Sequence, residues 1–194
     1  MKQFLLLALI AGLLYAGCGA PTGPTPSTTP GAGQKPVMLK FVLFELTPEA
    51  AGFDQIYADL KRYQSAHPGV SFQLVTNAES PLVAQESPGD LALIRARDLQ
   101  DLVGRGGIEP LSARTTPAEL QQFSPQSLAR CKAADVLFAL PWLQGKAPGD
   151  DWLLISYALS LNKPVAVEVM KFLITDPTTL KELTQATSLQ PAKK

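Results

Sequence analysis

Residue types that commonly carry covalent or metal chemistry are scarce in this chain, which has two cysteines and one histidine. The histidine stands in the run His67-Pro68-Gly69, where proline disfavours helix at the preceding residue and glycine permits a chain reversal. We therefore expect His67 to mark a helix stop. A lone histidine cannot build a His-rich metal site, and the common nucleophile, zinc, dinucleotide and phosphate-loop motifs do not occur. A site made of carboxylates alone stays open, but the sequence predicts no enzyme, metal or cofactor.

Cys18 lies between an apolar segment and a tract rich in proline, threonine and glycine. One basic residue, Lys2, is followed by residues 4–14, which carry no charge. This run is too short to span a bilayer as a helix, for which roughly 20 apolar residues are needed. A short basic start followed by a short apolar run is typical of a secretory signal, whereas a buried core helix is the alternative. We expect export.

The tetrad Tyr15-Ala16-Gly17-Cys18 resembles the bacterial lipobox, in which the cysteine thiol accepts a diacylglycerol and becomes the acylated N-terminus. Two small residues precede the cysteine as in that motif, while Tyr15 departs from the usual leucine. The alternative is ordinary signal cleavage near Ala20, for which Pro21 is a poor setting. The resemblance implies a signal peptide and lipobox in residues 1–18, lipidation of Cys18, and an extracytoplasmic protein anchored to a bacterial membrane, at the cell surface or in the periplasm.

Residues 19–36 have the composition of a flexible tether, because proline and glycine recur there without an apolar period. Residues 37–194 then provide one domain of ordinary size. The 17 basic and 17 acidic residues of the chain cancel, so no basic field is available to attract nucleic acid. If Cys18 is acylated, Cys131 has no disulfide partner, and we expect it to be a small apolar core residue.

Apolar periodicity predicts an alternation of strands and helices. Residues 37–44 form a near-continuous apolar run typical of a buried strand, and residues 49–67 carry one apolar helical stripe, with Thr47 as cap and Pro48 at the first helical position. Further strands are predicted at 70–75, 90–94 and 151–156. Further helices are predicted to begin at Asp98, Thr116-Pro117, Ser124-Pro125, Lys163 and Asp176-Pro177. Residues 189–191 are predicted to be an irregular end of the domain. This order predicts an α/β fold with a mostly parallel sheet and helices on both faces.

The motifs along this domain resemble, in their order, the extracellular solute-binding proteins of ABC importers, the sugar-binding branch in particular. The matching stretches are Tyr63–Phe72 (YQSAHPGVSF), Pro88–Ala92, Asp98-Leu99, Gly107–Leu111, Phe138–Trp142, Ile155–Asn162, Ala166–Pro177 and Leu189–Pro191. They cover most of residues 37–194. The resemblance implies a protein that binds a sugar outside the cytoplasm and works with an ABC permease.

The chain departs from this family after Pro141-Trp142, where family members pass into a second lobe. Here Leu143–Asp150 leads directly to the segment that returns from that lobe, and so short a stretch is a surface loop. We therefore expect a single periplasmic-binding-protein-like lobe with its C-terminal helices packed back on it.

Five residues are candidates for binding a ligand at the strand ends, since open α/β sheets bind ligands beyond the carboxyl ends of their strands. Glu45, Asn77 and Arg95 follow predicted strand ends, Trp142 follows the apolar run of residues 136–140, and Trp152 enters the late strand. Aromatic faces suit sugar rings, and charged groups suit sugar hydroxyls. Each has a structural alternative, because tryptophans are commonly core or lid residues and Arg95 could be a solvated loop charge.

Two functions remain open at this point. The first is a carbohydrate-binding lipoprotein of an ABC importer, reduced to one lobe, whose single wall would limit affinity to about millimolar. The alternative is a membrane-tethered protein-interaction module that keeps the lobe as a scaffold without binding a small ligand. A concave polar and aromatic cleft would favour the first, and an exposed apolar patch where the missing lobe would dock would favour the second.

Overall fold

The structure is a computed structural model and describes residues 35–77, 79–82, 89–147 and 149–193. Cys18, the predicted signal peptide and the predicted tether up to residue 34 lie outside the described residues. The elements are β1 (Val37–Phe44), α1 (Phe53–Ala66), β2 (Val70–Asn77), β3 (Leu91–Arg95), the 3-10 turn η1 (Ala96–Asp98), α2 (Leu99–Gly104), α3 (Pro117–Leu120), α4 (Pro125–Ala129), β4 (Lys132–Ala133), β5 (Val136–Leu137), β6 (Ala139–Gln144), β7 (Trp152–Ser156), α5 (Lys163–Thr175), α6 (Pro177–Thr187) and β8 (Gln190–Pro191).

Six strands form one sheet in the order β2-β1-β3-β7-β6-β8. Strand β1 pairs in parallel with β2 and β3, whereas β7 pairs antiparallel with β3 and β6, and β8 antiparallel with β6. Four of the six strands therefore run in one direction, as predicted for a mostly parallel sheet, but the pairing is mixed. The reason is the short connection of residues 145–151, because a hairpin can join only antiparallel neighbours.

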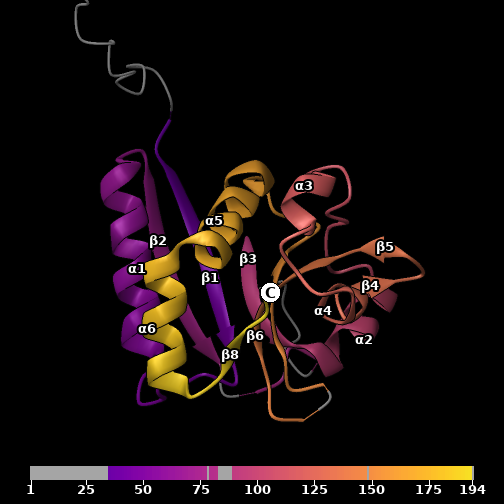
Figure 1. The fold of residues 1–194 in the computed structure, drawn as a ribbon. Helices are drawn as coiled ribbons and strands as arrows, with labels where there is room; N and C mark the ends of the chain where they lie inside the picture. Colours follow the sequence, from indigo (N-terminus) through magenta and orange to yellow (C-terminus); the bar gives the residue numbers. More distant parts are fainter. Residues whose placement is uncertain (1–34, 78, 83–88, 148, 194) are drawn as a thin grey trace, which may run out of the picture. The chain divides into compact units, whose positions relative to one another are not determined.

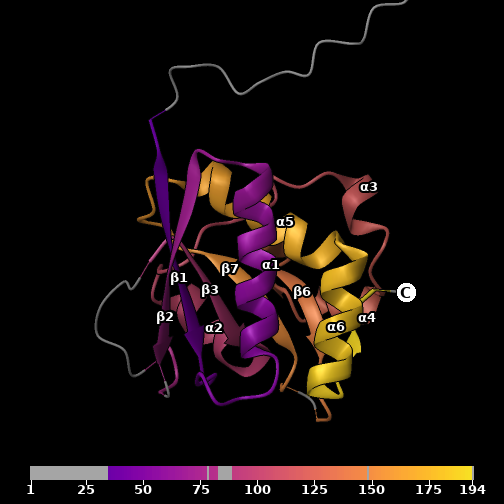
Figure 2. The same cartoon turned by 90° about the vertical axis from the view of Figure 1, so that its left-hand side faces the viewer.

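Helices cover both faces of the sheet, as predicted. Figures 1 and 2 show α1, α5 and α6 against one face, and α2, α3 and α4 on the other. The C-terminal helices contact α1 and the central strands, so they pack back on the lobe as expected. Side chains of β1 are buried from Phe41 to Phe44, and all five residues of β7 are buried, which places the core around the middle of the sheet.

The first helix begins later than the sequence predicted. Thr47 and Ala50 instead close a turn, and α1 begins at Phe53 after Gly52, whose φ is 93°. A Cβ at Gly52 would lie 2.7 Å from Cγ2 of Thr187 on α6. The chain must therefore reverse at a glycine beside α6 before the helix can begin, and Thr47-Pro48 does not cap it.

The other predicted helix starts are confirmed, with one exception. Thr116, Ser124 and Asp176 each accept a hydrogen bond from a backbone N–H of the first turn that follows. Asp98 does not cap α2, because its backbone is already helical and its buried carboxylate instead accepts a hydrogen bond from Ser80. The predicted trailing segment also differs, since β8 adds an edge strand to β6.

The chemically reactive side chains have structural roles. Cys131 is fully buried and unpaired, which confirms it as a core residue, and burial raises the pKa of its thiol. His67 follows the last residue of α1, and its ring stacks on Tyr63 with centroids 4.0 Å apart, which confirms the helix stop. Among the helices of the described residues, none is long and apolar enough to cross a membrane.

Candidate functional site

The carboxyl ends of β1 and β3 bring two of the predicted residues together. Glu45 follows β1 directly, with a left-handed φ of 56°, and Arg95 is the last residue of β3. Because β1 and β3 are parallel neighbours, their side chains meet at this edge, and Nε of Arg95 lies 3.4 Å from Oε2 of Glu45. An acceptor and a donor thus stand side by side where the fold places ligands.

Arg97, which follows in η1, ties this edge to the β6–β7 hairpin. Its Nη2 donates to both carboxylate oxygens of Glu45 at 2.6 Å, and its Nη1 donates to Oδ1 of Asp150 at 2.9 Å. Arg95 also donates to the backbone carbonyl of Asp150 at 3.0 Å. The hydrogen bond to Glu45 raises the pKa of Arg97. Two arginines and two carboxylates therefore neutralise one another at the site.

Trp152 provides an aromatic face directly beneath Arg95. The two residues pair across β3 and β7, and the guanidinium carbon of Arg95 lies 4.6 Å from the indole centroid. Trp152 is 6% exposed, and its buried indole N–H has no hydrogen-bond partner among the described residues. Burial lowers the pKa of Arg95, opposed by Glu45. The site therefore offers one unused donor next to an aromatic ring that an arginine covers.

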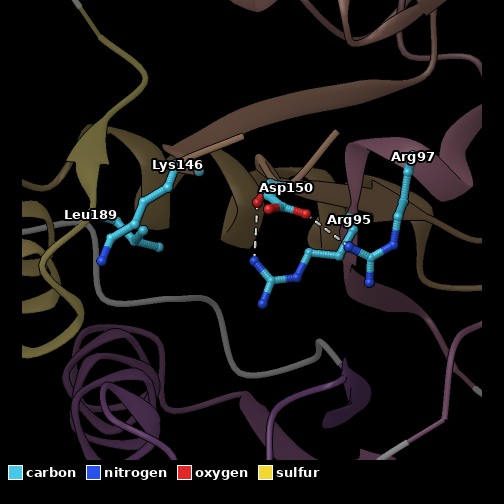
Figure 3. A pocket seen from close by; sticks show the side chains of 6 residues that line it. Arg95, Arg97, Lys146, Asp150 and Leu189 are labelled. Carbon is cyan, nitrogen blue, oxygen red and sulfur yellow. Dashed lines mark hydrogen bonds and ion pairs between the residues drawn. The ribbon is translucent and has the colours of Figure 1, made fainter. Parts of the chain in front are cut away.

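Two small hollows adjoin these residues and share Arg95 and Leu189 in their walls. One, of about 250 Å³, extends over Arg97, Lys146 and Asp150. Figure 3 shows Arg95 and Arg97 directed at Asp150, with Lys146 and Leu189 on the side away from Arg97. The other, of about 260 Å³, is lined by Glu45, Leu46, Ala50, Ala51, Trp152 and Thr187 in addition. Each is smaller than the roughly 300–1,000 Å³ of typical ligand pockets.

The hairpin of residues 145–151 holds Asp150 in place. Asp151 is 4% exposed, accepts a hydrogen bond from the N–H of Gly145 at 2.9 Å, and pairs with Arg130. A Cβ at Gly145 would lie 2.4 Å from the carbonyl carbon of Asp150, so only glycine fits. Among the described residues, no group of three His, Cys, Asp or Glu side chains could hold a metal ion.

The structure brings together three of the five predicted ligand residues, Glu45, Arg95 and Trp152. Trp142 was wrongly predicted, because it is 1% exposed and its indole N–H donates to the carbonyl of Leu173 on α5 at 3.1 Å, which makes it a core residue. Asn77 ends β2 opposite Phe44, and its side chain lies outside the described part of the chain.

Sequence reasoning missed Arg97 and Asp150. The signal for Arg97 is its position two residues after Arg95, just beyond a strand end, where a second charged side chain can reach the same edge. Asp150 has no comparable signal, because its place depends on how the hairpin closes. The backbone N–H of Arg97 donates to the carbonyl of Gly149 at 3.0 Å, and this contact brings the hairpin over η1.

Solved structures with the same fold are found at low sequence identity. The maltotriose-binding protein of Thermus thermophilus bound with maltotriose is similar with a TM-score of 0.66 and 10% identity, over 79% of this chain and 81% of that one. The chain has the fold of a periplasmic-binding-protein lobe. A putative oligosaccharide periplasmic-binding protein from Synechococcus sp. MITs9220 gives a TM-score of 0.65 at 11% identity, over 80% and 77% of the two chains.

An ABC substrate-binding protein from Listeria monocytogenes in complex with cycloalternan also has a TM-score of 0.65, at 6% identity over 81% of this chain and 80% of that one. No protein-family model matches the sequence, and the comparison with curated proteins finds no match. These structural neighbours are binding proteins for sugars, and at such identities the likeness establishes the fold.

Proposed function

We propose that this protein is a membrane-anchored, extracytoplasmic binding protein that takes a carbohydrate-type solute for an ABC importer. One observation carries the proposal: Glu45, Arg95 and Trp152 meet at the carboxyl ends of β1 and β3, the edge at which open α/β sheets bind ligands. The similar structures are named for oligosaccharide binding, which supports the same ligand class. The proposed role is binding and delivery, without catalysis.

In this proposal each residue of the site has a part. The Trp152 ring supplies an apolar face for a sugar ring, and its unpartnered indole N–H supplies a donor to a hydroxyl. Glu45 and Asp150 accept hydrogen bonds from other hydroxyls, and Arg97 donates. Because Arg95 covers the Trp152 ring, a ligand must displace its guanidinium and compete with the ion pairs. We therefore expect weak binding, with a dissociation constant of about a millimolar.

Anchoring and the single lobe belong to the same proposal. Acylation of Cys18 would hold the protein at the membrane, since two or three acyl chains bind a bilayer stably. The β6–β7 hairpin stands where the resembling family continues into a second lobe, so the ligand would contact one wall. Intact-mass measurement of the mature chain tests the anchor, and a mass without fatty acid would contradict it.

A second candidate function is a tethered protein-interaction module, and two observations favour it. The charged groups of the site are already paired with one another. A larger groove of about 820 Å³ lies away from the strand ends, between α3, α4 and the β4–β5 hairpin. Its walls include Leu120, Phe123 and Leu128, which would suit an apolar segment of a protein.

Thermal-shift measurement of the full chain in detergent, against a panel of sugars and oligosaccharides, distinguishes the two functions. A ligand at 100 times its dissociation constant adds about 2.7 kcal/mol of stability, which is readily measured. The proposal expects a shift with at least one oligosaccharide that is lost in Arg97→Gln and kept in Arg105→Gln, which changes an arginine outside the site. Failure of every sugar to shift the midpoint would favour the interaction module.

A further inference from the structure

Two leucines project from the turn of residues 157–162 that joins β7 to α5. The side chain of Leu159 is 79% exposed and that of Leu161 is 97% exposed, although both are large apolar residues. The turn, Tyr157-Ala158-Leu159-Ser160-Leu161-Asn162, contains no charged side chain. Exposed apolar side chains that cluster mark sites of protein or membrane interaction, whereas scattered ones need no explanation.

The turn is held rigidly by Asp90, which is 9% exposed. One of its carboxylate oxygens accepts hydrogen bonds from Oγ of Ser160 at 2.5 Å and Nδ2 of Asn162 at 3.2 Å. The other accepts the backbone N–H of Lys40 at 2.9 Å. The carbonyl of Asp90 accepts the N–H of Tyr157 at 3.1 Å. The leucines are therefore presented by a fixed scaffold and do not belong to a loosely held loop.

This turn lies at the end of the sheet where β1 begins. Asp90 links it to Lys40, four residues into the chain from Pro36, and Met38 at the same end of β1 is 62% exposed. Figures 1 and 2 show the start of β1 and the start of α5, just after the turn, at the same upper end of the lobe. Three of the exposed large apolar side chains, Met38, Leu159 and Leu161, are thus near the point at which the predicted tether joins the lobe.

We propose that the Leu159/Leu161 turn inserts into the outer surface of the bilayer that carries the anchor, so that the lobe docks on the membrane in one orientation. The inference rests on the proposed acylation of Cys18. A chain the length of residues 19–36 spans about 20–25 Å as a Gly-rich random coil and about 55 Å as an extended Pro-rich one, so the amino end of β1 stays within a few tens of ångströms of the lipid. At that distance the turn meets the bilayer at a high effective concentration.

The geometry favours lipid over another protein. A stable protein interface buries roughly 800 Å² on each partner, far more than two leucines and a methionine can offer. These side chains also protrude, whereas a protein partner would be expected to meet a broader surface of matching shape. Shallow insertion beside a lipid anchor needs far less buried apolar area than a protein interface, because the acyl chains supply most of the affinity, and it needs no matching shape.

An environment-sensitive fluorophore tests the inference on the mature, acylated protein, whose chain begins at Cys18. Leu161→Cys is labelled with NBD and compared with Val136→Cys, whose position is an exposed apolar one on the β4–β5 hairpin. Cys131 is fully buried and acylated Cys18 has no thiol, so labelling is selective. The chain is reconstituted on vesicles of phosphatidylethanolamine and phosphatidylglycerol. We expect a blue shift and quenching by doxyl lipids at position 161 and neither at position 136, and Leu159→Ser should reduce the shift.

Each other outcome overturns the inference in a distinguishable way. If the chain floats with the vesicles while the probe at position 161 stays water-like, the anchor stands and insertion is wrong. If the chain does not float, the anchor itself fails and insertion fails with it. A blue shift that appears without vesicles and grows with protein concentration would show that a second copy covers the leucines.

Discussion

The guanidinium of Arg95 covers the indole of Trp152, with 4.6 Å between the guanidinium carbon and the ring centroid. The contact follows from the sheet register, because Arg95 on β3 and Trp152 on β7 are paired residues of antiparallel neighbours. Glu45 and the carbonyl of Asp150 hold the same guanidinium from two further sides. The ring that would receive a sugar is therefore reached only when this arginine moves.

Removal of the covering side chain should expose the ring. In Arg95→Ala, acrylamide should quench tryptophan emission more strongly than in the wild type, because Trp142 remains buried and only Trp152 gains access to solvent. The lost cation–π contact should cost about 1 kcal/mol of unfolding free energy. Arg105→Ala serves as the matched control, and quenching that is equal in both variants would show that Arg95 does not shield the ring.

The hairpin between β6 and β7 should depend on a single glycine. Gly145→Ala should lower the unfolding free energy by about 2 kcal/mol, since its Cβ would lie 2.4 Å from the carbonyl carbon of Asp150. Gly104→Ala is the control, because a Cβ there meets nothing within 4 Å and alanine restricts the unfolded chain. Urea denaturation measures both, and equal midpoints would mean that the hairpin tolerates a different backbone.

Stability should fall at alkaline pH through Cys131. Burial, with a smaller contribution from Asp151, raises the pKa of its thiol above the ordinary 9.0, so the folded state keeps the proton that the unfolded chain releases. The contribution is fully present below about pH 9 and is lost as the pH rises further. Urea midpoints between pH 8 and 10 should decline less steeply in Cys131→Ala. An unchanged slope would mean that other groups cause the decline.

The leucine-bearing turn should loosen when its anchor changes. Asp90→Asn places an amide NH₂ among the donors that now share the carboxylate, from Lys40, Ser160 and Asn162. The variant should lose about 1–3 kcal/mol of stability, and amides of residues 157–162 should exchange faster with deuterium. Asp135→Asn, an exposed change in the β4–β5 turn, should leave both measurements as they are. Unaltered exchange in Asp90→Asn would contradict a role for Asp90 in fixing the turn.

Local patterns predicted the elements well and their pairing less well. The cap residues Thr116, Ser124 and Asp176 each bond to a backbone N–H three residues later. Local sequence therefore suffices to predict these helix starts. The late start of α1 was not predicted because it depends on the close contact between Gly52 and Thr187, which is far away in the sequence. Likewise, the β6–β7 hairpin places β7 next to β6, and β7 lies between β3 and β6. The apolar periodicity of a single strand does not predict which strands are its neighbours.

The candidate site was predicted only in part, because some of its residues are marked by local sequence and others are brought there by distant contacts. Glu45 and Arg95 end strands, and the rule that ligands lie beyond strand ends finds such residues without knowledge of contacts. The apolar run before Trp142 predicts a strand that ends there, but β6 continues past it to Gln144, so its ring points into the core beneath α5. Asp150 reaches the site only through the closed hairpin, which a single sequence cannot reveal.

Tryptophan fluorescence with Trp142→Phe, which leaves Trp152 as the only indole, tests the central claim most directly. Maltotriose and other oligosaccharides are titrated into the full chain up to tens of millimolar, a range chosen from the expected affinity of about a millimolar. A ligand that displaces Arg95 and stacks on the ring should change the emission in a saturable way with at least one of these sugars, and Arg97→Gln should weaken that change. Emission that stays constant with every sugar over this range would contradict a carbohydrate site at Trp152.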